Sequence, residues 1–167
     1  MSSRLRSDVR RRGRRLAEQG GVDVEERDGT SDLHALLDEG FAVEARGWKG
    51  RAGTAIASSP VTRRFYTDVA RWAVEHGWLR LFFLRLDGRA VAFALCLAHG
   101  QRLYLVKNGY DEAYARCSPG KVLLRATIEY ACRHRMRSYE FLGSDEPHKL
   151  EWTSTTRELL LLSLIHI

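Results

Sequence analysis

Two segments in the C-terminal third of the chain combine a candidate phosphate site with a group of titratable side chains. Residues 118–121, with the sequence SPGK, are typical of a helix start, because Ser caps a helix and Pro fits its first turn. The free backbone N–H groups and the positive dipole end of such a helix can bind a phosphate. Residues 145–152, with the sequence DEPHKLEW, carry carboxylate, imidazole and ammonium groups. A phosphate site beside such groups indicates transfer of a chemical group from a phosphate-bearing cofactor.

The hydrophobic pattern predicts the elements that must position these two segments. Runs of alternating or continuous apolar residues predict strands over residues 22–27, 79–86, 89–98, 102–107 and 139–142. Helices are expected after Ser31, after Ser59-Pro60 and from Pro119 to about His134, with a Gly-rich loop over residues 47–53. Asp87-Gly88, between the second and third strands, is a strong signal for a two-residue hairpin.

The order of these elements predicts a mixed α/β fold. Three sequential strands joined by tight turns form an antiparallel meander. The helix that follows them leads to a last strand, and such a strand–helix–strand crossover places its two strands in parallel. We therefore expect one central sheet with helices on both faces.

Length and composition limit the classes of protein that fit. The chain has 167 residues, which suits one domain with a substantial core. Three widely spaced cysteines show no metal-ligand spacing, so we expect no metal site and no disulfide framework. The sequence has no secretion signal and no apolar run long enough to span a membrane, which favours the cytoplasm.

Both ends of the chain differ from its body. Residues 1–21 form an Arg-rich arm or an interdomain helix, whose apolar residues, Leu5, Val9 and Leu16, are too sparse for a core helix. Its basic charge fits a solvated helix, or alternatively a surface for nucleic acid. The body covers residues 22–157. Residues 158–167 end in an apolar run without a partner, so we expect a truncated or non-native tail.

Several motifs in order resemble the GNAT superfamily of acyltransferases, in its FemABX-like branch. This branch includes the CelD-like proteins of bacterial cellulose and exopolysaccharide synthesis. The resemblance runs over residues 22–157 and implies the second GNAT half of a longer protein, with an N-terminal half as its partner. The motifs lie at residues 44–50 (EARGWKG), 64–66 (RFY), 109–111 (GYD), 114–115 (YA), 118–120 (SPG) and 143–152 (GSDEPHKLEW).

The resemblance implies acetyl-CoA or another acyl-CoA as co-substrate, with no metal. In this fold the pantetheine chain pairs with an exposed strand edge and the pyrophosphate lies at a helix start. Here that implies cofactor-binding roles for Lys107, Ser118, Gly120 and Lys121. Trp48, Lys49 and Tyr110 are the candidates for the acceptor pocket. The competing interpretation is a routine helix cap and packing or solvated loop residues.

Acyl transfer to an amine requires a base, and the resemblance directs attention to the loop after the last strand. Histidine is the usual side chain for proton transfer at physiological pH, so His148 could take the proton. Asp145 or Glu146 could do so instead, or could form a solvated acidic turn. Lys149 could stabilise a developing oxyanion, or could be an ordinary surface lysine.

Three functions remain open at this point. The first is N-acyl transfer, and specifically N-acetyl transfer, to an amine of a sugar or of a cell-envelope or exopolysaccharide precursor. The second is transfer from aminoacyl-tRNA, with the Arg-rich arm contacting RNA. The third is a degenerate GNAT module that serves as an interaction domain in polysaccharide synthesis.

Overall fold

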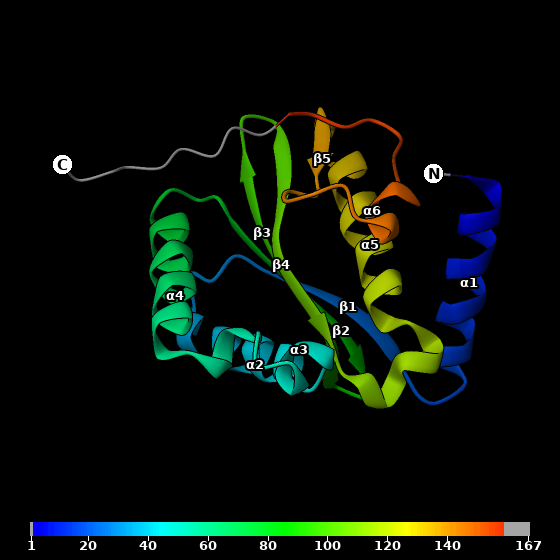
Figure 1. Ribbon diagram of the computed structural model, residues 1–167, viewed down its shortest axis with the longest axis horizontal. Coiled ribbons are helices and arrows are strands. Elements are labelled where there is room, and N and C mark those ends of the chain that lie inside the picture. The colour runs from blue at the N-terminus through cyan, green and yellow to red at the C-terminus, as the bar shows by residue number, and fades with distance from the viewer. Residues whose placement is uncertain (1, 159–167) are drawn as a thin grey trace.

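The computed structural model describes residues 2–158 and shows one sheet between two layers of helices (Figure 1). The five strands are β1 (Val22–Arg27), β2 (Leu79–Leu86), β3 (Arg89–His99), β4 (Arg102–Tyr110) and β5 (Ser138–Glu140). The α-helices are α1 (Ser3–Ala17), α2 (Leu33–Ala45), α3 (Trp48–Arg51), α4 (Pro60–Glu75), α5 (Pro119–Arg133) and α6 (Pro147–Leu150). Two short 3-10 helices, η1 (Ile56–Ser58) and η2 (Glu112–Cys117), complete the described elements.

The strands lie in the sheet in the order in which they occur along the chain. Strands β1 to β4 pair antiparallel, and β4 pairs with β5 in parallel. Asp87 and Gly88 both have positive φ, at 48° and 81°, as a tight two-residue hairpin requires. The register between β3 and β4 shifts at Leu95/Cys96, because β4 carries one extra residue, Val106, between their partners Lys107 and Leu105. The predicted mixed α/β fold is therefore confirmed.

Each face of the sheet is covered by its own pair of helices. Helices α1 and α5 pack on one face, against side chains such as Leu84 and Leu103. Helices α2 and α4 pack on the other, against side chains such as Phe83 and Phe93. Successive strand residues point to opposite faces, so the continuous apolar runs of β2 and β3 supply both layers. Figure 1 shows α1 and α5 together on one side and α2 and α4 on the other.

Helix α1 joins the first of these layers. Leu5, Val9 and Leu16 are buried and belong to the same cluster as Leu123 and Leu124 of α5. The expectation that this segment has too few apolar residues for a core helix is wrong, because a narrow apolar stripe is enough for a helix that packs mainly on α5 and η2. The division of the chain at residue 21 stays a prediction.

Several predicted boundaries also need correction. Asp32, not Ser31, is the residue before α2, and part of the expected loop over residues 47–53 forms α3. Strand β5 ends at Glu140, so residues 141–143 leave the sheet. Residues 147–150 of the expected polar loop form α6. All but the first residue of the predicted tail, residues 159–167, lie outside the described residues.

Candidate functional site

Strands β4 and β5 separate halfway along the sheet. They pair only through Arg102, Leu103 and Tyr104 of β4, although β4 continues to Tyr110. Among the described residues no strand pairs with this side of β4 beyond Tyr104. Strand edges carry backbone N–H and C=O groups that an extended molecule can pair with. The separation therefore leaves an open strand edge inside the sheet.

Helix α5 begins beside the far end of this edge. A Cβ atom added to Gly120 would lie 3.1 Å from the Tyr110 ring, so the helix start and the end of β4 are in contact. Pro119 has no N–H, and the N–H groups of Lys121 and Val122 both bond to Ser118 O. Among the described hydrogen bonds the Gly120 N–H has no partner, as expected at a helix start.

Two cations flank this helix start, and both already have partners within the chain. Arg12 Nη1 of α1 donates to Ser118 Oγ at 2.6 Å, so Ser118 does not cap the helix with its side chain as predicted. Lys121 Nζ donates to Glu151 Oε2 at 2.5 Å. Arg12 is a candidate that the sequence analysis missed, because it lies in the arm. The arrangement provides one free N–H and two positive charges at a point where a phosphate could bind.

Two of the sequence motifs meet on the other face of the sheet. Helix α2 crosses β4 at Gly109, where an added Cβ would lie 2.6 Å from Glu44 Cα. An added Cβ at Gly47 would lie 2.9 Å from Tyr110 O, and one at Gly50 would lie 1.8 Å from Ala45 O. Glycines in residues 44–50 and 109–111 therefore let the two segments pack backbone against backbone. Any side chain at these positions would keep the segments further apart. This approach places Glu44 and Lys49 against β4.

A buried carboxylate with two lysines results from this contact. Lys49 Nζ lies 3.3 Å and Lys107 Nζ lies 3.4 Å from the same oxygen, Glu44 Oε1. The other oxygen, Oε2, accepts the Ile56 N–H at 2.9 Å. Lys49 Nζ also donates to Asn108 O at 2.7 Å. Burial lowers the pKa of Lys49, against the opposing effect of the Glu44 carboxylate.

A second buried carboxylate ties the same motifs together. Asp111 Oδ2 lies 2.8 Å from Arg46 Nε and accepts a hydrogen bond from Arg89 Nη2 at 2.9 Å. Its Oδ1 accepts the Ala113 N–H at 3.0 Å. Because both oxygens are occupied by residues of this chain, Asp111 holds the end of α2 and the hairpin end of β3 in place.

The loop before α6 is closed by Lys149. Its Nζ donates to Leu142 O at 2.8 Å and to Ser144 O at 3.0 Å, and lies 3.2 Å from Glu146 Oε2. These contacts use the ammonium group to hold the loop, so a direct catalytic role for Lys149 stays a prediction. His148 is exposed, with Nε2 3.4 Å from Glu146 Oε2, and Asp145 is exposed.

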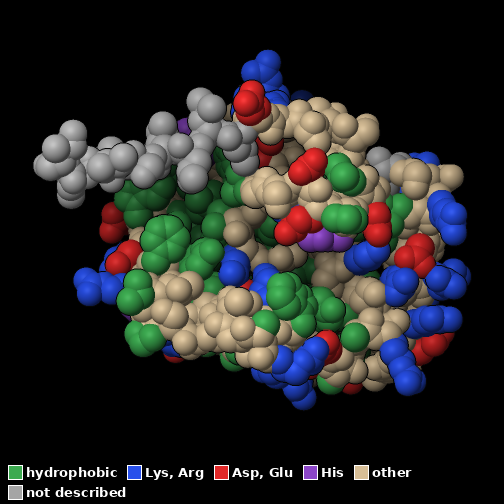
Figure 2. All heavy atoms as spheres, viewed as in Figure 1, with side chains coloured by type: hydrophobic (Ala, Val, Ile, Leu, Met, Phe, Trp, Pro, Cys, Tyr) green, Lys and Arg blue, Asp and Glu red, His purple; other side chains and the backbone are tan. Residues whose placement is uncertain are grey.

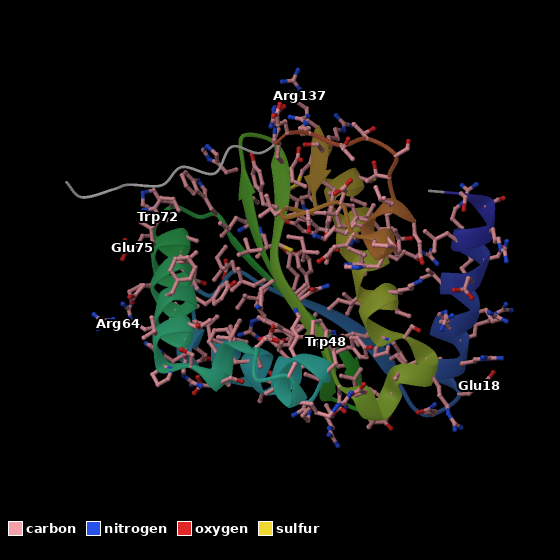
Figure 3. The ribbon with its side chains drawn as sticks, in the orientation of Figure 1. Glu18, Trp48, Arg64, Trp72, Glu75 and Arg137 are labelled. Atoms are coloured by element: carbon pink, nitrogen blue, oxygen red, sulfur yellow. The ribbon has the colours of Figure 1, made fainter. Side chains whose placement is uncertain are left out.

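The Glu146 carboxylate of this loop is one of the charges that act on Lys49. Figure 2 shows a hollow between the α2–α3 layer and the α6 loop, with basic, acidic and histidine side chains around it. By the central recess we mean the group formed by Glu44, Lys49 and Lys107, together with Glu146, whose charge acts on Lys49. Trp48, which is 53% exposed, lies on the α3 side near the end of β4 (Figure 3).

The partly buried side chain of Tyr139 lies where β4 and β5 part. Tyr139 Oη is 3.0 Å from Thr127 Oγ1 of α5, and burial raises the pKa of Tyr139 well above its usual range. Tyr139 lines a small cavity together with Asn108, Gly109 and Gly120. A neutral hydroxyl group at this point can donate a proton or a hydrogen bond.

The predicted site residues therefore fall into three groups. Ser118, Gly120 and Lys121 lie at the start of α5 with the Tyr110 ring. Lys107, predicted with them, faces α2 on the other side of the sheet and joins Lys49. Asp145, His148 and Lys149 lie in the loop above.

The sequence analysis did not identify Glu44, which both lysines contact, as a site residue. One feature of the sequence could have indicated it. Glu44 continues the buried face of α2 formed by Leu37, Gly40 and Phe41, where a charged residue is unexpected without a partner.

Within residues 2–158 no group of His, Cys, Asp and Glu side chains could hold a metal ion. No helix of the described chain is long and apolar enough to cross a membrane.

Comparisons with known proteins agree with this geometry. A family described as acetyltransferase (GNAT) domain matches residues 3–150. No curated protein sequence matches the chain.

Solved structures resemble the fold at low sequence identity. The aminoglycoside acetyltransferase AAC(6')-Iy, in complex with a bisubstrate analog, is 13% identical with a TM-score of 0.59, over 87% of this chain and 100% of its own. The PaiA N-acetyltransferase of Thermoplasma acidophilum, in complex with coenzyme A, is 15% identical with a TM-score of 0.51, over 68% of this chain and 75% of its own.

A third solved structure is the ribosomal-protein-S18-alanine N-acetyltransferase of Escherichia coli. It is 18% identical with a TM-score of 0.50, and the match covers 70% of this chain and 63% of that one. The chain thus spans less than two thirds of the length of that enzyme.

Proposed function

This chain belongs to the family of acetyltransferase domains of the GNAT type, and we propose that it moves an acetyl group from acetyl-CoA to an amine. We propose an amine of a sugar or of a cell-envelope or exopolysaccharide precursor, in the cytoplasm. Support for a sugar amine comes from the motifs of the FemABX-like branch and from the aminoglycoside acetyltransferases among the solved structures. The N-terminal half implied by the same resemblance is proposed as a partner.

The observation that carries the proposal is the open edge of β4, with the start of α5 at one side and the central recess at the other. The Gly120 N–H, Arg12 and Lys121 would hold the phosphates of acetyl-CoA, and the free edge of β4 would pair with its extended chain. When bound, acetyl-CoA supplies the thioester from which the acetyl group is taken.

The residues of the recess would act on the acceptor. An amine attacks as the neutral base, so its ammonium form must first lose a proton. His148, Glu146 and Asp145, in the loop over the recess, are the candidates to take that proton. Tyr139, a partly buried side chain whose pKa is raised by desolvation, is a candidate to donate a proton or a hydrogen bond to the departing sulfur.

The test is the thermal midpoint of the protein with and without millimolar acetyl-CoA, beside a Ser118→Asp variant. A ligand that binds only the folded state stabilises it by about 2.7 kcal/mol at a concentration of 100 Kd. Asp fits the left-handed backbone of Ser118, where φ is 46°, and can still accept from Arg12. The variant should therefore stay folded while its carboxylate repels the phosphates.

A rise in the midpoint that the Ser118→Asp variant lacks would support donor binding at the start of α5. The absence of a rise in a cooperatively folding protein would contradict the proposal. It would favour transfer from aminoacyl-tRNA, which predicts strongly salt-dependent tRNA binding, or a module without catalysis.

A further inference from the structure

We infer that the acceptor carries an anionic group, a carboxylate or a phosphate, near its reacting amine, and that Lys49 and Lys107 bind this group. The inference rests on the proposed acetyl transfer and names the class of acceptor for the same site. It is argued from the charges of the central recess, from their burial and from their unused hydrogen-bond donors.

The recess has more positive than negative charge. Two ammonium groups lie 3.3 and 3.4 Å from one oxygen of one carboxylate, Glu44 Oε1. Glu44 is 1% exposed, and its second oxygen is bound to the Ile56 N–H. No other carboxylate of the described chain pairs with Lys107. One positive charge is therefore left without a partner in a buried setting, where electrostatic effects are stronger than in water.

The remaining carboxylate near the pair does not cancel this charge. Glu146 acts on Lys49 from the loop above, but its Oε2 lies 3.2 Å from Lys149 Nζ and 3.4 Å from His148 Nε2. Counting Glu44 and Glu146 against Lys49, Lys107 and Lys149 again leaves one positive charge. The whole group around the recess thus attracts an anion.

Both lysines have donors left to bind one. An ammonium group carries three N–H donors. Lys49 Nζ uses one on Asn108 O and lies beside Glu44, and Lys107 Nζ lies beside Glu44 and 5.4 Å from the centre of the Tyr66 ring. The two side chains are 20% and 19% exposed, so each has a small accessible part. A carboxylate or phosphate is small enough to accept from both and strong enough as an acceptor to offset their desolvation.

The same charges disfavour a polycationic acceptor. An amine with several further positive charges would bring like charges to two buried ammonium groups, and nothing in the recess but the shared Glu44 and Glu146 would compensate them. An amino sugar with an anionic substituent meets both requirements, an amine to be acetylated and a group for the lysines.

Four amines test the inference by calorimetric titration, each with and without saturating CoA. Glucosamine is the neutral-substituent reference, muramic acid adds a carboxylate, glucosamine 6-phosphate adds a phosphate and neamine adds further amines. Charge-assisted hydrogen bonds predict that one of the two anionic sugars binds about 10- to 100-fold more tightly than glucosamine. Whichever does so separates the carboxylate from the phosphate as the recognised group.

Charge variants show whether the lysines are responsible. Lys107→Gln should reduce the preference for the anionic sugar about tenfold or more, and Lys107→Arg should restore part of it. Glu44→Gln removes the negative charge while keeping an acceptor for Ile56, so it should increase the preference. Arg64→Gln is the matched control, since it removes one positive charge from the outer surface of α4, away from the recess (Figure 3).

Equal affinity for glucosamine and both anionic sugars would overturn the inference, as would tighter binding of neamine. A preference that Lys107→Gln and Arg64→Gln lower equally would also overturn it. These results are independent of the donor test: anion preference without an acetyl-CoA effect would contradict the proposed transfer but keep the anion site. Acetyl-CoA binding without anion preference would keep the proposed transfer but contradict the anion site.

Discussion

The two sides of the open β4 edge are built in opposite ways. At the start of α5 the polar groups are near the surface, and each cation pairs with a carboxylate, Arg12 with Asp8 and Lys121 with Glu151, while Arg12 also donates to Ser118. In the central recess a fully buried carboxylate holds two largely buried ammonium groups. The first side is made by one local backbone feature, and the second depends on helix–strand contacts between distant segments. We expect the first to tolerate substitution and the second to couple binding to stability.

Removal of the Glu44 charge is the strongest way to break this contrast. Glu44→Leu would leave two largely buried ammonium groups without their carboxylate and the Ile56 N–H without an acceptor, so we expect a loss of about 3–5 kcal/mol in unfolding free energy. That loss corresponds to a fall in the thermal midpoint on the order of 10 °C. Glu75→Leu, on the exposed side of α4 (Figure 3), is the control and should change little. Equal effects of the two substitutions would show that Glu44 is not a structural centre.

The close approach of α2 to β4 gives the second prediction. Gly109→Ala would place a Cβ atom 2.6 Å from Glu44 Cα, a backbone atom that cannot move alone. We expect a loss of about 1–3 kcal/mol in urea unfolding. Gly13→Ala in α1, where the nearest contact is Val122 Cγ1 at 4.0 Å, should instead stabilise the protein by up to about 1 kcal/mol. If Gly109→Ala left the unfolding free energy unchanged, α2 and β4 could move apart at this point without loss of stability.

The third prediction concerns the loop above the recess. Lys149→Ala removes the donor to Leu142 O and Ser144 O, and we expect a fall in kcat of about tenfold with a rise in the acceptor KM. A fall in kcat alone would favour a direct role in the chemistry. An unchanged kcat would remove Lys149 from the mechanism. His148→Gln is the companion variant, since a base at His148 predicts a changed pH profile of kcat with the loop intact.

The smallest effect is expected on the α1 side. Hydrogen bonds from Arg12 and Arg11 lower the pKa of Asp8 from 3.8 to about 2. Because the folded state holds the lower pKa, this contribution to stability is complete above pH 3.8 and is lost as the pH falls to about 2. Between pH 4 and pH 2 the thermal midpoint should therefore fall less for Asp8→Asn than for the wild type. Parallel curves for the two proteins would contradict the ion pairing of Asp8.

Most of the fold could be predicted from the sequence because its signals are local. The hairpin at Asp87-Gly88 needs only the backbone preferences of two residues, and Ser59 caps α4 as expected because its hydroxyl group contacts a residue three positions on. The end of β5 was misplaced because the separation of β4 and β5 depends on the surrounding structure. No pattern within residues 138–143 encodes it.

In the site, too, only the features that depend on local sequence could be predicted. The start of α5 could be located from the sequence SPGK alone. The pairing of Glu44 with Lys49 and Lys107 could not, because it joins a helix to a strand more than 60 residues away and depends on the contact at Gly109. Lys107 was accordingly predicted on the donor side, whereas its ammonium group lies in the recess.

The break between β4 and β5 also has a consequence for unwanted association. An outer sheet edge is open to strands of other proteins, which is how many aggregates begin. The open part of β4 begins where β5 ends, since the two strands are paired only as far as Tyr104–Glu140. The start of α5 contacts the other end of this part at Tyr110, so a strand of another protein would have to fit between β5 and α5. The open part of β4 is therefore less accessible to other proteins than an outer strand edge would be.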